Sequence, residues 1–155
     1  MLYFAYGSNM DWNEMRACCP SAQFVCLGKL NDYRLAFTRR SQTRGCGVAD
    51  IVKNRNDVVW GVIYDIAEGD LPNLDSKEGY RVGRRSNAYE PIEVTVQADG
   101  RQDRLLRARA YLVCRQEHPN PNPNAAYKRL LVAGARHWRL PADYVAQLEQ
   151  IGVAE

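Results

Sequence analysis

The chain has no long hydrophobic run. None of its apolar stretches approaches the roughly 18 residues that a membrane-spanning helix needs. The opening residues Met1-Leu2-Tyr3-Phe4 carry no basic leader, and the chain reaches the polar pair Ser8-Asn9 almost at once, unlike a secretory signal peptide. We therefore expect a cytoplasmic protein with no membrane partner.

Residues that bind metals or form thiol nucleophiles are few and poorly spaced. The only histidines are His118 and His137, and the five cysteines show no CxxC spacing. Zinc sites need short, regular Cys/His spacings, so we expect no metal and no other cofactor. A Cys–His catalytic pair is disfavoured because neither histidine stands in a context typical of a catalytic base. We expect the cysteines to be reduced thiols in the core.

Long runs of one charge are also missing. The net charge is only +3, and the local basic clusters are Arg39-Arg40 and the group Arg81, Arg84 and Arg85. A nucleic-acid-binding protein usually has a basic face with interleaved aromatic residues, so we expect no nucleic-acid partner. We interpret the clusters as solvated loop edges, with attraction of an acidic small substrate as the alternative.

The composition that remains is that of a globular protein. The chain has 155 residues, of which 46% are apolar and 25% charged, and this predicts a single domain over residues 1–155. Segments rich in aromatic or branched residues and bounded by turn residues predict strands. The predicted strands are 2–6, 28–38, 58–66, 91–97 and 106–113.

Helical signals lie between and after these strands. Asp11 can cap a short helix that runs through Cys18, although Asn9 could equally supply the cap. Further helices are expected at 67–74, continuing toward Glu78, and then at 125–137 and from Pro141 to Ile151. The pattern predicts an α+β fold in which a mixed, mostly antiparallel sheet closes into a small β-barrel with flanking helices.

Two short stretches far apart in the sequence carry the chemistry. In the first, Tyr3–Asn9, a strand-like alternation ends in Gly7-Ser8-Asn9, a turn whose successive backbone N–H groups can point at one negative atom. The second, Leu74–Tyr80, presents the carboxylate of Glu78. Taken alone, the position of Glu78 before Gly79 favours a solvated residue at a helix end, and the turn is equally a simple strand-to-helix connection. Ser8 has no candidate base nearby and is a poor nucleophile.

At these residues the chain resembles the γ-glutamylcyclotransferase family, also called AIG2-like or BtrG-like. Tyr3–Met10 is similar to the family's substrate loop, and Leu74-Asp75 with Glu78-Gly79 looks like its catalytic-carboxylate segment. The C-terminal pair of helices carries the third match, through Tyr127, Leu130, Gly134-Ala135, Leu140-Pro141, Tyr144 and Leu148. Together these cover essentially the whole chain.

The resemblance implies a barrel of about five or six strands with flanking helices. It also implies an enzyme that cyclises a γ-glutamyl compound to 5-oxoproline and releases an amine, with Glu78 as general acid and base. The implied substrate contacts are Tyr3, Phe4, Ala5, Tyr6, Gly7, Ser8, Asn9, Tyr111 and Tyr127.

One segment departs from the family pattern. The stretch 80–89 is long and basic where the eukaryotic members look shorter, and it is expected to border the pocket mouth, so the identity of the substrate and its leaving group cannot be inferred from the family. The leaving group could be an amino acid, an amine or part of a biosynthetic intermediate. The rival function is a non-catalytic module that binds a carboxylate ligand on the same fold. A small-molecule γ-glutamyl substrate is the expected partner, and a homodimer is left open.

The chemistry explains why so few residues would suffice. The substrate's own α-amine attacks its γ-carbonyl, so proximity is built into the substrate. One carboxylate can accept the ammonium proton and return it to the departing amine. Its pKa should then exceed the usual value of about 4.3, which burial against Tyr6, Tyr80 or Tyr89 would achieve. The amides of the turn would hold either the oxyanion or the substrate α-carboxylate.

Overall fold

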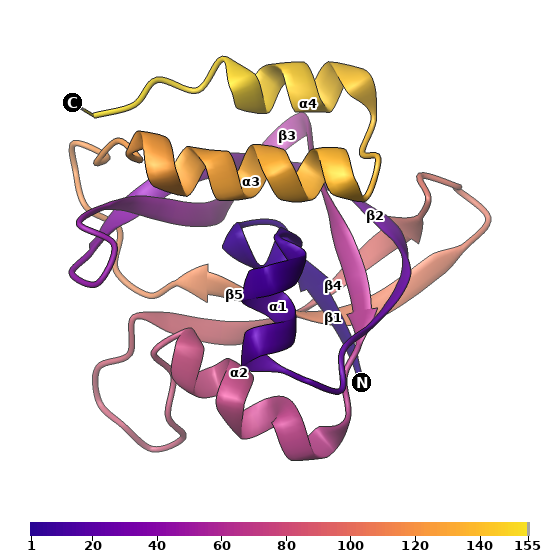
Figure 1. The fold of residues 1–155 in the computed structure, drawn as a ribbon, viewed down its shortest axis with the longest axis horizontal. Helices are drawn as coiled ribbons and strands as arrows, with labels where there is room; N and C mark the ends of the chain where they lie inside the picture. The colour runs from indigo at the N-terminus through magenta and orange to yellow at the C-terminus, as the bar shows by residue number, and fades with distance from the viewer. Residues whose placement is uncertain (155) are drawn as a thin grey trace.

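The computed structural model describes residues 1–154, and its centre is a closed barrel of five strands in the order β1-β3-β2-β4-β5 (Figure 1). The strands are β1 (Leu2–Ala5), β2 (Gln23–Ser41), β3 (Cys46–Asp65), β4 (Tyr89–Ala98) and β5 (Leu105–Val113). All neighbours pair antiparallel except β1 and β5, which close the barrel in parallel where Tyr3 lies opposite Arg109. The predicted mixed, mostly antiparallel barrel is confirmed.

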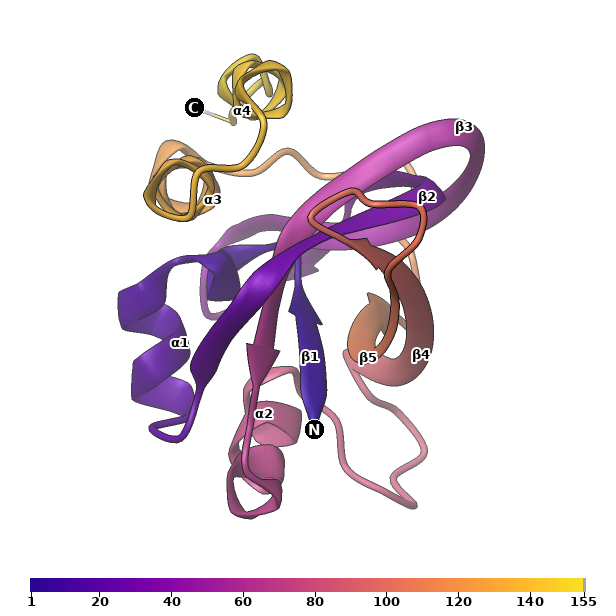
Figure 2. The ribbon, with the colours of Figure 1, turned by 90° about the vertical axis from the view of Figure 1, so that its right-hand side faces the viewer.

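Within the described residues 1–154, four helices flank the barrel. They are α1 (Trp12–Cys18), α2 (Leu71–Lys77), α3 (Ala125–His137) and α4 (Ala142–Glu149), and short 3-10 turns η1 (Ser8–Met10) and η2 (Glu68–Asp70) precede the first two. Figure 2 shows α3 and α4 side by side at one end, α2 at the other, and α1 between them. No helix among residues 1–154 is both long and apolar enough to cross a membrane.

The strands β2 and β3 are much longer than the sequence predicted. They form one hairpin that pairs from Gln23 with Asp65 to Ser41 with Cys46, interrupted by register shifts. The segment 46–57 was not predicted as a strand because neither half alternates between apolar and polar residues: residues 46–51 are all buried and include Gly47 and Asp50, and from Lys53 on the segment is polar and faces solvent. A strand that leaves the barrel has no buried face, so the apolar alternation on which prediction depends is lost.

The start of α1 settles which residue caps it. The Asp11 side chain accepts a hydrogen bond of 3.0 Å from the backbone N–H of Glu14, as an N-cap does. Asn9 therefore does not cap α1, and its buried side chain can contribute to the site described below.

All five cysteines are free thiols, but they do not all lie in the core. Cys19, Cys26 and Cys46 are buried as expected, whereas Cys18 is half-buried and Cys114 is exposed. The expectation of core thiols is therefore wrong for Cys114, which follows the last barrel strand directly and so leaves the interior.

Candidate active site

Glu78 is held at the end of α2 by the backbone around it. Its N–H donates to the carbonyl of Leu74 at 3.0 Å, and the next residue, Gly79, turns the chain with φ of +65°. A Cβ at Gly79 would lie 2.9 Å from the Cβ of Ala88, so both the conformation and the space demand glycine here. The sequence Glu-Gly therefore ends the helix with the carboxylate in a defined place.

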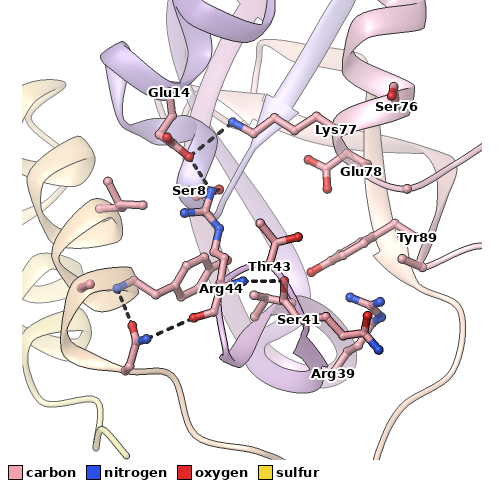
Figure 3. Close-up of a pocket in the computed structure, with 18 residues that line it drawn as sticks. Ser8, Glu14, Arg39, Ser41, Thr43, Arg44, Ser76, Lys77, Glu78 and Tyr89 are labelled. Atoms are coloured by element: carbon pink, nitrogen blue, oxygen red, sulfur yellow. Dashed lines mark hydrogen bonds and ion pairs between the residues drawn. The ribbon is translucent and has the colours of Figure 1, made fainter.

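That carboxylate lies in a small inner cavity of about 30 Å³ that opens to a larger outer cleft of about 910 Å³. The inner cavity is lined by Tyr3, Tyr6, Gly7, Ser8, Asn9, Ala49, Glu78, Tyr89, Tyr111 and Tyr127. Four of these residues, Ser8, Glu78, Tyr89 and Tyr127, also line the outer cleft (Figure 3). The two stretches singled out in the sequence thus meet in one cavity.

Burial raises the pKa of Glu78 to about 7, while the cationic Lys77 and Arg44 lower it. The Asn9 amide nitrogen donates to Glu78 Oε1 at 3.3 Å and to the Tyr3 hydroxyl at 3.0 Å. The Asn9 amide oxygen in turn accepts from Lys77 Nζ at 2.5 Å. Asn9 therefore orients the carboxylate, and Glu78 can exchange a proton near neutral pH.

The turn before α1 contributes unpaired donors to the same cavity. Gly7, Ser8 and Asn9 all line it, and within residues 1–154 none of their backbone N–H groups donates a hydrogen bond. The first N–H groups of a helical turn have no partner in that turn, which explains why they are free. A ligand oxygen entering the cavity can therefore find amide donors beside Glu78.

Hydrogen bonds fix several of the cavity's tyrosines. Tyr6 donates to the carbonyl of Tyr111 at 2.5 Å, and Tyr89 donates to the carbonyl of Ala49 at 2.6 Å. The Tyr127 hydroxyl accepts from the N–H of Ala49 at 3.0 Å, which leaves its own hydrogen available to a ligand. Burial raises the pKa of Tyr6, Tyr89 and Tyr127, so all three hydroxyls stay protonated.

A second polar cluster ties α2 to the barrel. Asp75 Oδ1 accepts from the Tyr111 hydroxyl at 2.5 Å and from Arg109 Nη2 at 2.7 Å. Arg109 Nε also donates to the Tyr111 hydroxyl at 2.9 Å. Because Asp75 precedes Glu78 by one helical turn, this cluster holds the end of α2 against β5.

Two of the predicted substrate contacts do not lie at the cavity. Phe4 and Ala5 are fully buried and line neither the cavity nor the cleft. The Phe4 ring points into the barrel, where only glycine leaves room for it: a Cβ at Gly61 would come within 2.8 Å of the ring. Phe4 and Ala5 therefore do not line the cavity: the Phe4 ring fills the barrel interior, and Ala5 is fully buried in β1 opposite Val62 of β3. Their part in substrate binding stays a prediction.

The sequence reasoning also missed residues that line the site. Ala49 lies in the unpredicted part of β3, and Tyr89 was considered only as a wall. The side chain of Asn9 was not expected to touch Glu78. Of these site residues, only Lys77 could have been anticipated from the sequence, because it directly precedes Glu78.

The basic loop between α2 and β4 faces away from the cleft, except at its ends. Gly79, Ala88 and Tyr89 line the cleft. Tyr80, Arg81, Val82 and Arg84 instead line a separate groove beside α2. Tyr80 is therefore not a wall of the candidate site, and these arginines do not face it.

The fold and cavity correspond to a known class of protein. The sequence model of the AIG2-like family matches residues 58–148, which include Glu78 and Tyr127. A solved structure of a γ-glutamyl cyclotransferase superposes with a TM-score of 0.90 at 33% identity, covering 100% of this chain and 89% of that chain. A human protein described as uncharacterised superposes with a TM-score of 0.89 at 34% identity, covering 99% of this chain and 89% of its own.

Curated sequences agree with the structures. Human γ-glutamylcyclotransferase is 35% identical over 97% of this chain and 78% of that protein, and the bovine enzyme is 34% identical over the same shares. This chain therefore belongs to the AIG2-like family, and within it to the γ-glutamylcyclotransferases.

Proposed function

We propose that the protein is an enzyme that cyclises a γ-glutamyl amino acid, γ-glutamylamine or related compound to 5-oxoproline, with Glu78 as general acid and base. One observation carries the proposal. A carboxyl group with its pKa raised to about 7 by burial shares a small cavity with three unpaired backbone amides. Membership of the γ-glutamylcyclotransferases supports the reaction class.

The reaction balances with a single proton carrier. The ionised Glu78 takes a proton from the substrate α-ammonium, and the freed amine attacks the γ-carbonyl carbon. A carbon–nitrogen bond forms to close the five-membered ring, and the bond to the leaving nitrogen breaks. Glu78 returns the proton to that nitrogen, which regenerates the carboxylate. The ring nitrogen still carries two hydrogens after the attack and gives up the second to water or to the departing amine, which leaves 5-oxoproline and the free amine.

The remaining contacts would stabilise charge and position. The amides of Gly7, Ser8 and Asn9 and the free hydroxyl hydrogen of Tyr127 are donors for the negative oxygens of the substrate. Tyr3 and Tyr111, whose rings lie 6.0 Å apart edge to face, would form the wall on the barrel side. Ring closure then proceeds in a site whose donors are already in place.

Replacing the carboxylate by its amide tests the proposal. Glu78→Gln keeps the shape but cannot carry the proton, so the rate of 5-oxoproline release should fall roughly 10²–10⁴-fold. The measurement is 5-oxoproline formed from a panel of γ-glutamyl compounds. Glu68→Gln makes the same change on the exposed turn before α2 and should leave the rate unaltered.

Two results would contradict the proposal. Undiminished 5-oxoproline release by Glu78→Gln would exclude Glu78 as the proton carrier. Saturable binding of γ-glutamyl compounds without product by the wild-type protein would favour the rival function, a non-catalytic module that binds a carboxylate ligand.

A further inference from the structure

The outer cleft has an excess of positive charge. Three cationic side chains line it, Arg39, Arg44 and Lys77, together with the carboxylates of Glu14 and Glu78. Since Glu78 gives up its proton only near pH 7, Glu14 is the one carboxylate in the lining expected to be ionised well below neutrality. The cleft therefore suits a ligand that brings negative charge of its own.

Two of the three cations are already engaged. Arg44 forms an ion pair with Glu14 and lies over the Tyr127 ring, with its Cζ atom 5.2 Å from the ring centroid. Lys77 Nζ donates to Asn9 at 2.5 Å and lies 3.4 Å from Glu14 Oε1. Both are held by the protein and both act on Glu78.

Arg39 is different. It comes from β2, is half-buried in the cleft wall, and forms no ion pair and no side-chain hydrogen bond with any residue of the described range 1–154. Its pairing with Val48 in the hairpin fixes its backbone. Figure 3 shows its guanidinium group beside Tyr89, across the cleft from Lys77 and Glu14. A half-buried guanidinium with five donors and no partner is suited to a ligand carboxylate.

The size of the inner cavity decides which part of the ligand reaches Arg39. With a volume of about 30 Å³, the inner cavity has room for only a few atoms beside Glu78. The leaving group must therefore extend into the outer cleft, toward the wall that carries Arg39 and Tyr89. The α-carboxylate of the γ-glutamyl half is joined to the reacting carbon through the short glutamyl chain, so it cannot extend as far from Glu78 as the leaving group can.

We propose that Arg39 binds a carboxylate on the leaving group and so selects γ-glutamyl compounds that release an amino acid over those that release an uncharged amine. This inference rests on the proposed function and narrows its substrate class. The other basic residues do not compete for the role: Arg40 is exposed and outside the cleft lining, and Arg81 and Arg84 face the separate groove.

A matched pair of substrates tests this selection. γ-Glutamylalanine and γ-glutamylalaninamide differ only in whether the leaving group carries a carboxylate or a neutral carboxamide. In Arg39→Gln, kcat/KM for the acid should fall about 10- to 100-fold, chiefly through KM, while kcat/KM for the amide stays within about twofold. Comparing the acid-to-amide ratio of kcat/KM in the variant with that in wild type cancels the different intrinsic reactivity of the two substrates.

Arg40→Gln is the control, because it removes the same charge from the neighbouring residue of the same strand without touching the cleft. It should keep the wild-type ratio. The proposal would be overturned if the acid-to-amide ratio of kcat/KM were the same in wild type and Arg39→Gln. If kcat/KM for both substrates also fell by the same factor, Arg39 would be a structural residue only.

Failure of the proposed function gives a separate result. If the wild-type protein forms no 5-oxoproline from any γ-glutamyl compound, calorimetric binding of the same two compounds still tests Arg39. Tighter binding of the acid that Arg39→Gln abolishes would support the carboxylate subsite, and equal binding of both compounds would overturn it.

Discussion

At the scale of single residues, the site depends on how one carboxylate is kept partly protonated near pH 7. Burial favours the neutral form of Glu78, and the nearby charges of Lys77 and Arg44 favour the ionised form. The balance leaves a group that can both accept and donate a proton. Neither effect is visible in the sequence around Glu78 apart from the adjacent lysine.

This balance predicts the pH dependence of activity. The first step needs ionised Glu78, so kcat/KM for 5-oxoproline release should fall about tenfold per pH unit below an apparent pKa near 7. Lys77→Met removes a charge that lowers this pKa, so the acidic limb should move to higher pH. Lys53→Met, on the exposed part of the hairpin, should leave the profile in place. An unmoved limb in Lys77→Met would contradict this account.

The same group predicts a pH dependence of stability. Folded Glu78 keeps its proton up to about pH 7, whereas the unfolded chain releases it near pH 4.5. Between these values the folded state binds more protons, so the free energy of unfolding should fall as pH rises, by at most about 3 kcal/mol. Glu78→Gln cannot titrate and should lack this loss.

Urea unfolding of wild type and Glu78→Gln at several pH values between 4.5 and 7.5 measures the difference. The variant should gain stability relative to wild type as pH rises. A constant difference across this range would show that burial does not raise the pKa of Glu78.

At the scale of elements, the turn at residues 7–9 is positioned by close contact between η1 and α3. A Cβ on Gly134 of α3 would lie 2.4 Å from the carbonyl carbon of Met10, so only glycine allows the two segments to approach this closely. Tyr64 and Trp138 reinforce the contact: the Tyr64 hydroxyl donates to the carbonyl of Asn9 at 2.9 Å, and Trp138 Nε1 donates to the carbonyl of Met10 at 2.9 Å. Met10 follows Asn9 directly, so α3 supports the residue that orients Glu78.

Gly134→Ala should therefore disturb both stability and activity. Alanine favours a helix by about 1 kcal/mol over glycine, yet overpacking against backbone should lower the free energy of unfolding by about 1–3 kcal/mol. Thermal or urea unfolding and kcat/KM measure the two effects. Gly152→Ala is the control, since no atom lies within 4 Å of its added Cβ. A gain in stability for Gly134→Ala would refute the packing argument.

The elements themselves were predictable where they have one buried and one exposed face. The strand at Leu2–Ala5 and the helix at Ala125–His137 follow their apolar periodicity closely. The first half of β3 was missed because it lacks alternation between apolar and polar residues: residues 46–51 are buried on both faces and include Gly47 and Asp50, and residues 53–57 are polar and exposed. Ala49, whose carbonyl accepts from the Tyr89 hydroxyl and whose N–H donates to the Tyr127 hydroxyl, lies in that missed segment.

At the scale of the whole molecule, a buried carboxylate links three parts of the barrel. Asp50 of β3 is 1% exposed and accepts from Thr38 Oγ1 of β2 at 2.7 Å and from the N–H of Val113 of β5 at 3.0 Å. Its Oδ1 also accepts from the N–H of Ile51 at 2.9 Å. These bonds connect strands that come from distant parts of the sequence.

Asp50→Asn should weaken the barrel as a unit. An amide nitrogen cannot accept hydrogen bonds, so one set of buried donors loses its partner and the free energy of unfolding should fall by about 1–3 kcal/mol. Urea unfolding measures the loss. Asp57→Asn, at the exposed register shift in the middle of β3, should change stability by less than about 0.5 kcal/mol. Equal free energies of unfolding for Asp50→Asn and Asp57→Asn would show that the hydrogen bonds of Asp50 do not stabilise the barrel.

The linear order of residues was enough to establish the type of fold, most of the helices and strands, and the two stretches that meet at the site. These features depend on periodicity, turn chemistry and motif spacing, all of which are local. Folding decided which side chains point into the cavity: it turned Phe4 and Ala5 away and brought in Ala49 and the side chain of Asn9. It also left Arg39 without a partner, because ion pairs and burial depend on neighbours that are distant in the chain.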